Sequence, residues 1–195
     1  MSRFDLTTDP LFLAGRRSFL ANGALLSAAA VALLAGRPAL AAQMKKNGAQ
    51  AQTEDLKILN GALAAEHQGI AAYEVGAKSG LLQKPVLDLA VQFQGHHKAH
   101  ADLLAATIKQ LGGQPVAARS QYDFPVDQLK TQADVLRFAA GLEQGAVSAY
   151  LAAVPSFDNR DLAKAAASIL GDEAMHWAIL RNALGDNPVP AAFVG

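Results

Sequence analysis

The chain contains an internal repeat, which constrains its fold more than any other feature. The stretch EHQGIAAY (66–73) matches EQGAVSAY (143–150) in its first and last residues, and FQGHHKAH (93–100) matches ILGDEAMH (169–176) without a gap. The two pairs of stretches are 77 and 76 residues apart. Two helical hairpins related by an approximate twofold axis would produce this repeat and would place equivalent residues opposite one another.

Four segments carry apolar residues at every third or fourth position, so each is expected to be an amphipathic helix. These helices are expected at about 54–78, 85–111, 131–154 and 159–183, and the Ala-rich composition favours them. Glycines at 80, 112 and 185 are typical helix stops. The links are short within each pair, whereas residues 114–129 form a long connection. The sequence therefore predicts an all-α four-helix bundle with one long crossover between helices 2 and 3.

The first 41 residues are expected to be a removable export signal. Arg16 and Arg17 precede an apolar run over 19–34, and small residues up to Ala41 suit cleavage after that position. The alternative is a membrane anchor, but the run is short and only mildly hydrophobic. We expect residues 42–53 to be a flexible lead-in and residues 54–195 to form the folded domain.

Composition excludes several kinds of site and partner. The chain has no cysteine, so disulfides, thiolate metal sites and cysteine nucleophiles are excluded. Beyond residue 41 there are 13 basic and 15 acidic residues, a net charge of about −2. No basic face is apparent, so nucleic acid is not an expected partner.

A set of possible metal ligands follows from the repeat. Glu173 and His176 lie three residues apart on an expected buried helix, where they share a face and can chelate one ion. An unpaired buried carboxylate is costly, so Glu173 needs such a partner. The repeat supplies equivalent residues on the other three helices. The predicted ligands are three carboxylates and three imidazoles: Glu66, His97, His100, Glu143, Glu173 and His176.

This pattern resembles the ferritin-like superfamily, which includes ferritins, rubrerythrins and manganese catalases. The family template has a Glu from each of two helices and Glu-x-x-His from each of the other two, around two metal ions. The resemblance covers nearly all of residues 54–185. It implies a metal centre that holds either iron, as one or two ions, or manganese. Tyr73 and Tyr150 resemble a Tyr found seven residues after the ligand Glu, and we expect their hydroxyls to bond a carboxylate.

One position departs from the family pattern, because His97 stands where the family has Glu. The alternatives are two metals with an unusual ligand set, one metal, a preference for zinc or copper, or a metal-free polar network. His96 is a rival ligand, since His96 and His100 are four residues apart, but the repeat register favours His97. We expect Asp172 to be solvated. Four glycines inside the helices are expected to mark close helix approach: Gly69, Gly95, Gly145 and Gly171.

These residues favour one function and leave two others open. The first is a metal-binding protein that handles iron, peroxide or dioxygen, or stores metal, with no separate acid, base or nucleophile. The second is a metal-free stress or structural protein, and the third is an oxygenase acting on an organic substrate. The string RRSFL (16–20) resembles the twin-arginine signal family, which implies export of the folded protein to the periplasm or beyond, although Gly15 and Ala21 depart from its usual residues. After signal removal we expect no stable membrane insertion, and the protein could form a homo-oligomer.

Overall fold

The computed structural model describes the backbone of residues 38–194 and the side chains of residues 48–194. Most of the signal expected over residues 1–41, namely residues 1–37, lies outside this part of the chain. Four helices make up most of the described residues: α2 (Pro38–Lys78), α3 (Lys84–Gln110), α4 (Gln132–Ala153) and α5 (Arg160–Ala183). Two single 3₁₀ turns, η1 (Val126–Gln128) and η2 (Val154–Ser156), lie in the connections. No strand occurs between residues 38 and 194, so the all-α prediction is confirmed.

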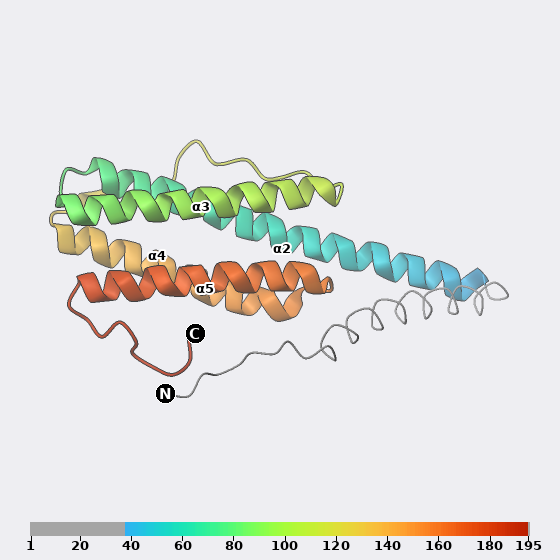
Figure 1. Ribbon diagram of the computed structural model, residues 1–195. Helices are drawn as coiled ribbons and strands as arrows, with labels where there is room; N and C mark the ends of the chain where they lie inside the picture. Colours follow the sequence, from blue (N-terminus) through green and yellow to red (C-terminus); the bar gives the residue numbers. More distant parts are fainter. Residues whose placement is uncertain (1–37, 195) are drawn as a thin grey trace, which may run out of the picture. The chain divides into compact units, whose positions relative to one another are not determined.

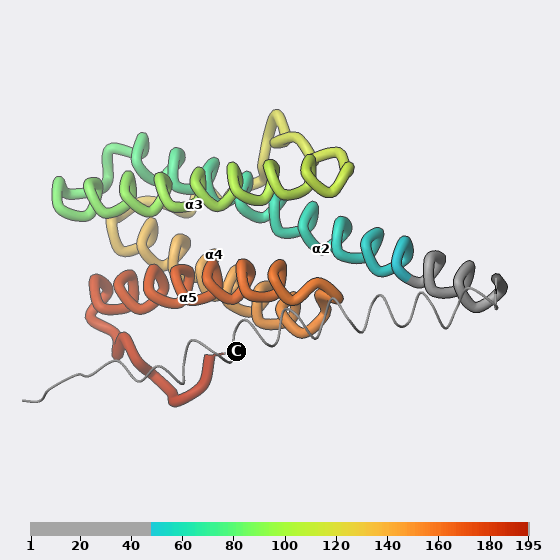
Figure 2. Tube along the Cα trace, turned by 45° about the vertical axis from the view of Figure 1, so that its right-hand side comes forward, coloured from blue at the N-terminus to red at the C-terminus, as the bar shows by residue number. Residues whose placement is uncertain are grey.

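From Ala51 onward the chain forms one compact unit of two stacked hairpins. One hairpin is α2 with α3, the other is α4 with α5, and both views show the first lying over the second (Figures 1 and 2). The connections within the hairpins are short, and residues 111–131 make the long crossover between α3 and α4. This arrangement confirms the predicted connectivity. No helix among the described residues is long and apolar enough to cross a membrane.

The predicted helix ends agree with the structure at every end except the first. Gly80 and Gly112 follow α2 and α3 with φ of 71° and 77°, a region that a residue with a Cβ rarely adopts. At the start of α4 the Thr131 side chain accepts a hydrogen bond from the Asp134 backbone N–H, and the Asp134 carboxylate accepts one from Thr131. At the start of α5 the Asn159 side chain accepts a hydrogen bond from the Asp161 backbone N–H.

The start of α2 corrects the expected flexible lead-in. Residues 42–53 are helical, because α2 already begins at Pro38. The segment AQMKKNGAQAQT has no regular apolar face, so periodicity did not indicate a helix there. Its Ala, Gln, Lys and Met residues nevertheless have high helix propensity, and Pro is favoured in the first turn.

The apolar core consists of two clusters, one at each end of the bundle. One includes Leu63, Leu104 and Ile169, and the other includes Phe93, Leu136 and Leu180. Along each of the four helices the buried glutamates and histidines lie between residues of these two clusters. The polar groups are thus enclosed at the middle of the bundle.

Candidate metal centre

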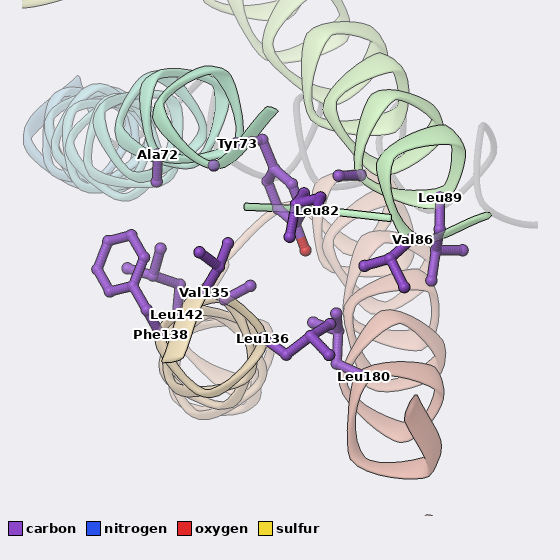
Figure 3. Close-up of a pocket in the computed structure, with 13 residues that line it drawn as sticks. Ala72, Tyr73, Leu82, Val86, Leu89, Val135, Leu136, Phe138, Leu142 and Leu180 are labelled. Atoms are coloured by element: carbon purple, nitrogen blue, oxygen red, sulfur yellow. The ribbon is translucent and has the colours of Figure 1, made fainter. Parts of the chain in front are cut away.

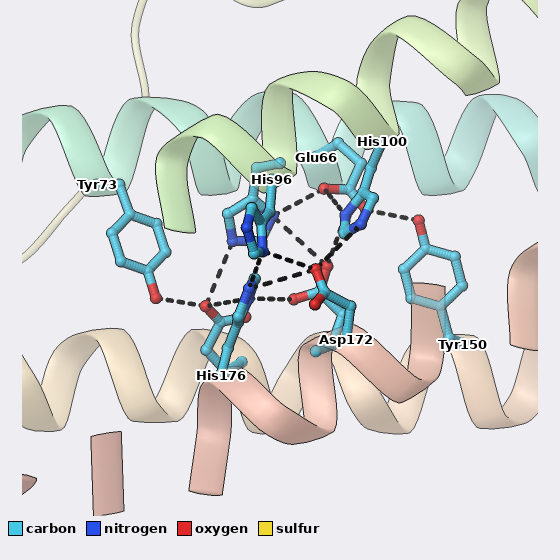
Figure 4. A network of polar contacts seen from close by, with 10 residues as sticks. Glu66, Tyr73, His96, His100, Tyr150, Asp172 and His176 are labelled. Atoms are coloured by element: carbon cyan, nitrogen blue, oxygen red, sulfur yellow. Dashed lines mark hydrogen bonds and ion pairs between the residues drawn. The ribbon is translucent and has the colours of Figure 1, made fainter. Parts of the chain in front are cut away.

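All six predicted ligands lie together at the middle of the bundle (Figure 4). α2 and α4 each provide one glutamate, α3 provides two histidines and α5 provides Glu173 and His176. Five of the six side chains are buried, with Glu143 and Glu173 at 0% exposure, whereas His100 is partly buried. Burying so many ionisable groups is costly unless they are paired or bind a metal.

The six residues form two overlapping groups of four. In each group one possible ligand atom per residue lies within 4.8 Å of the others. The two groups share His97 and Glu173, and each adds one terminal Glu and one terminal His. The groups are Glu66, His97, His100 and Glu173, and His97, Glu143, Glu173 and His176.

Glu173 lies between the two groups and faces each with a different oxygen. Its Oε1 lies 3.1 Å from His100 Nδ1, and its Oε2 lies 3.3 Å from His176 Nδ1. A carboxylate that presents one oxygen to each of two sites has the geometry of a bridging ligand.

His97 occupies the equivalent position on α3 and also faces both groups. Its Nδ1 lies 2.8 Å from Glu66 Oε2, and its Nε2 lies 3.3 Å from Glu143 Oε1. A neutral imidazole has only one unprotonated nitrogen, so His97 cannot replace a carboxylate that binds two ions at once. The centre therefore offers one bridging carboxylate instead of two.

The two tyrosines bond the terminal glutamates across the bundle, as expected from the sequence. Tyr73 on α2 donates its hydroxyl hydrogen to Glu143 on α4, and Tyr150 on α4 donates to Glu66 Oε1 at 2.6 Å. They flank the cluster at opposite ends (Figure 4). Burial and the neighbouring carboxylate raise the pKa of both phenols far above the usual value, so both remain donors.

Protons balance the carboxylates in the metal-free protein. Burial opposes the imidazolium form of His97, but hydrogen bonds to Glu143 and Glu66 outweigh it and raise its pKa to about 10. Burial also lowers the pKa of His100 and His176, but the neighbouring glutamate carboxylates raise it by more. The pKa values of both histidines are therefore about 9. Burial opposes the carboxylate form of Glu66 and Glu143, but bonds to the histidines hold their pKa below the usual range. Near neutral pH, protons thus supply positive charge where cations would bind.

The residues fit a metal ion in their chemistry and in their unpaired atoms. Among the described residues, the buried side-chain atoms without a hydrogen bond all belong to this cluster: His100 Nδ1, Glu143 Oε2, both carboxylate oxygens of Glu173, and His176 Nδ1. Buried polar atoms normally have a partner. Carboxylate oxygen with imidazole nitrogen suits iron and manganese.

The structure corrects the expectation that Asp172 is solvated and places His96 and His97 differently. Asp172 Oδ2 lies 3.0 Å from His96 Nδ1 and 3.3 Å from the Nε2 atoms of His100 and His176. His97 lies inside the cluster and His96 at its outer side, towards Asp172. Two signals could have identified this pair: Asp172 precedes His176 by four residues, and His96 and Asp172 are 76 residues apart, the repeat distance.

The expectation of close helix approach holds at only one of the four glycines. A Cβ on Gly69 would lie 3.2 Å from the His97 ring, so the missing side chain leaves room for this imidazole. A Cβ on Gly95, Gly145 or Gly171 would meet no other atom within 4 Å. Those three glycines therefore do not serve helix packing in this chain.

A small cavity lies in the apolar core, and a larger one adjoins the cluster. Figure 3 shows a cavity of about 20 Å³ near Tyr73 and Leu180, lined by apolar side chains; it holds about one water molecule and is part of the core. A larger cavity of about 400 Å³ lies between α2 and α4. Its walls are mostly Gly and Ala, and its polar lining includes Glu66, His97 and Glu143. This cavity therefore connects the cluster with a space large enough for a small molecule.

The fold and the site define the chain as a ferritin-like four-helix bundle with a central Glu/His cluster. The ferritin-like domain family matches residues 54–186, and the chain belongs to this family. No curated protein matches the sequence.

Solved structures share this fold. A conserved hypothetical protein from Mycobacterium tuberculosis is 26% identical, with a TM-score of 0.64 over 73% of this chain and 99% of that one. A dodecameric thioferritin from Bacteroides fragilis is 24% identical, with a TM-score of 0.60 over 69% of this chain and 86% of that one. A ferritin-like, diiron-carboxylate protein from Bacillus anthracis is 22% identical, with a TM-score of 0.60 over 69% and 97%. The last two show a shared fold alone.

Proposed function

We propose that the chain is an exported metalloprotein that binds two iron or manganese ions and handles iron, peroxide or dioxygen at them. The observation that carries the proposal is the pair of four-residue groups that share Glu173, with one of its oxygens facing each group. Glu66 with His100, and Glu143 with His176, are the proposed terminal ligands. When bound, such ions supply redox chemistry and polarise an oxygen ligand.

The protein's own residues orient the ligands and exclude water. Tyr150 holds Glu66 Oε1, which leaves Oε2 directed towards His97 and His100. Tyr73 instead holds Glu143 Oε1, the oxygen that itself faces His97 and His176. The apolar clusters close the site to water at both ends of the bundle, whereas the cavity between α2 and α4 reaches it from the side. Protons on the three inner histidines have to leave when cations bind, since only an unprotonated imidazole nitrogen is a ligand.

Elemental analysis of protein purified without chelators or a histidine tag tests the proposal. We expect about two ions per chain in the wild type, loss in Glu173→Ala and loss in His97→Ala. His67→Ala is the matched control, because His67 lies on α2 with its Nε2 3.3 Å from the Val116 carbonyl and outside the cluster. Metal retained in His97→Ala would remove His97 from the ligand set. No metal after anaerobic iron loading would refute the proposal and favour a metal-free stress or structural protein.

The large cavity favours a second candidate function, oxidation of a small apolar molecule. A volume of about 400 Å³ with an apolar lining and Glu143 at its polar part suits a substrate held next to the metal ions. Gly145→Leu would narrow the cavity, and a Cβ there meets nothing within 4 Å. This variant is expected to stop oxidation of an apolar substrate and to leave oxidation of added iron(II) intact. Equal loss of both activities would argue against the cavity as a substrate site.

Export and self-assembly complete the proposal. The RRSFL string, the apolar run after it and the small residues before Ala41 support export by the twin-arginine route to the periplasm. Replacing Arg16 and Arg17 together by Lys is expected to retain the protein in the cytoplasm, as measured by cell fractionation. The dodecameric state of the Bacteroides fragilis protein supports assembly into a homo-oligomer, which light scattering on the purified protein tests.

A further inference from the structure

A third group of potential ligands lies on the side of the cluster between α3 and α5. It consists of His96, Asp172 and His176, whose possible ligand atoms lie within 4.8 Å of one another. His96 Nδ1 is 2.9 Å from His176 Nε2 and 3.0 Å from Asp172 Oδ2, and His176 Nε2 is 3.3 Å from the same carboxylate oxygen. Two imidazoles and a carboxylate are a suitable set for a divalent transition-metal ion.

This group extends from the surface into the bundle. The side chain of His96 is 38% exposed, that of Asp172 is 21% exposed and that of His176 is 2% exposed. The Asp172 oxygen also lies 3.3 Å from His100 Nε2. A cation that reaches His96 from solvent therefore meets negative charge at Asp172, directly outside the two terminal histidines (Figure 4).

His176 faces both sides with different ring nitrogens. Its Nδ1 lies 3.3 Å from Glu143 and 3.3 Å from Glu173, whereas its Nε2 faces His96 and Asp172. A neutral imidazole has one unprotonated nitrogen, so His176 can bind a cation on one side at a time.

We propose that His96, Asp172 and the Nε2 of His176 form an outer loading site for a divalent transition-metal ion on its way to the inner cluster. His176 can bind a cation through only one ring nitrogen. An ion bound to Nε2 in the outer site would therefore have to leave His176 before the ring could bind an ion of the inner cluster through Nδ1. The outer site stands on its own contacts, whereas its role in loading rests on the proposed inner metal centre.

The first test measures the rate of loading with Co²⁺, whose absorption reports binding. Loss of His96 is expected to weaken Co²⁺ binding at the outer site by about ten- to a hundredfold. At Co²⁺ concentrations below the Kd of that site, His96→Ala should therefore fill the inner site more slowly by about the same factor, with no change in the final number of ions. His67→Ala is the control and is expected to load at the wild-type rate. Loading of His96→Ala at the wild-type rate would overturn the role in loading.

The second test separates the outer site from the inner one. In a Glu66→Gln, Glu143→Gln double variant the inner cluster loses two carboxylates, and one Co²⁺ per chain is expected to remain, bound by His96. Adding His96→Ala should abolish this binding, as measured by titration calorimetry. A double variant that binds no Co²⁺, or that binds it without His96, would overturn the outer site. If the wild type bound Co²⁺ at the outer site but not in the inner cluster, the proposed function would be contradicted and the outer site would stand.

Discussion

At the residue scale, His97 and Glu173 are repeat-equivalent positions with opposite charge. His97→Glu would place a second carboxylate between the two groups of possible ligands. We expect the variant to bind divalent cations more tightly and its metal-free form to unfold at lower temperature, because it loses one imidazolium and gains an anion. Calorimetric titration and thermal unfolding measure both effects. His97→Gln, which adds no charge, is the control, and equal behaviour of the two variants would contradict the argument.

The hydroxyl of Tyr150 makes a hydrogen bond whose energy can be measured. Tyr150→Phe keeps the ring in the core but removes the donor that lies 2.6 Å from Glu66 Oε1. A hydrogen bond to a charged group contributes about 1.5–3 kcal/mol, so the free energy of unfolding should fall by about that amount. Urea denaturation measures it. Tyr122→Phe removes a hydroxyl on the exposed crossover, bonded to Arg119 N–H, and should have little effect. An equal loss in both variants would argue against a special role for Tyr150.

The three inner histidines make the metal-free protein less stable as pH rises. Their pKa values are about 10 for His97 and about 9 for His100 and His176, against about 6.5 for an unfolded histidine. Between these values the folded state binds more protons than the unfolded state. The contribution of the protonated histidines to the free energy of unfolding is therefore complete below about pH 6.5. It is lost as the pH rises through 9 to 10. We expect a smaller free energy of unfolding at about pH 9.5 than at pH 7, and a weaker decrease in His97→Gln. A constant value over this range would contradict the pKa shifts.

At the scale of the elements, Asp55 links the first helix to the last. Its buried carboxylate on α2 accepts hydrogen bonds from the backbone N–H groups of Asp158 and Asn159, at 2.9 and 3.1 Å, where α5 begins. Asp55→Ala leaves both donors unpaired and should lower the free energy of unfolding by about 1.5 kcal/mol or more. Asp127→Ala on the exposed crossover is the control for loss of a negative charge. Equal stability of Asp55→Ala and the wild type would contradict this role.

The helices could be predicted largely because local signals and apolar periodicity agree. Gly80 and Gly112 end helices through backbone conformations that other residues avoid, and Thr131 and Asn159 begin helices through side-chain caps. The start of α2 could not be predicted in this way, because residues 42–53 have high helix propensity without an apolar face. The role of Asp55 could not be predicted either, since it depends on a contact between residues more than 100 positions apart.

At the scale of the whole molecule, the internal repeat made the site predictable. Equivalent residues of two hairpins face one another, so the pairing of Glu66 with Glu143 and of His100 with His176 followed from the sequence. The repeat distance also pairs His96 with Asp172, but it does not show which of the neighbours His96 and His97 points into the bundle, and that choice required the structure. The approximate symmetry also gives the cluster two unlike sides, a polar one between α3 and α5 and an apolar cavity between α2 and α4.

Metal binding should stabilise the whole bundle, because the possible ligands come from all four helices. A ligand that binds only the folded state at a hundred times its Kd adds about 2.7 kcal/mol, which for a chain of this size raises the Tm by about 5–11 °C per site. Each ion must displace protons from the histidines, so the rise in Tm on metal binding should be larger at pH 8 than at pH 6.5. Thermal unfolding with and without Mn²⁺ at both pH values measures this. Glu173→Ala removes the carboxylate that both groups share, and its Tm should rise less with Mn²⁺ than that of the wild type. An equal shift in the wild type and in Glu173→Ala would place the stabilising ion outside the cluster.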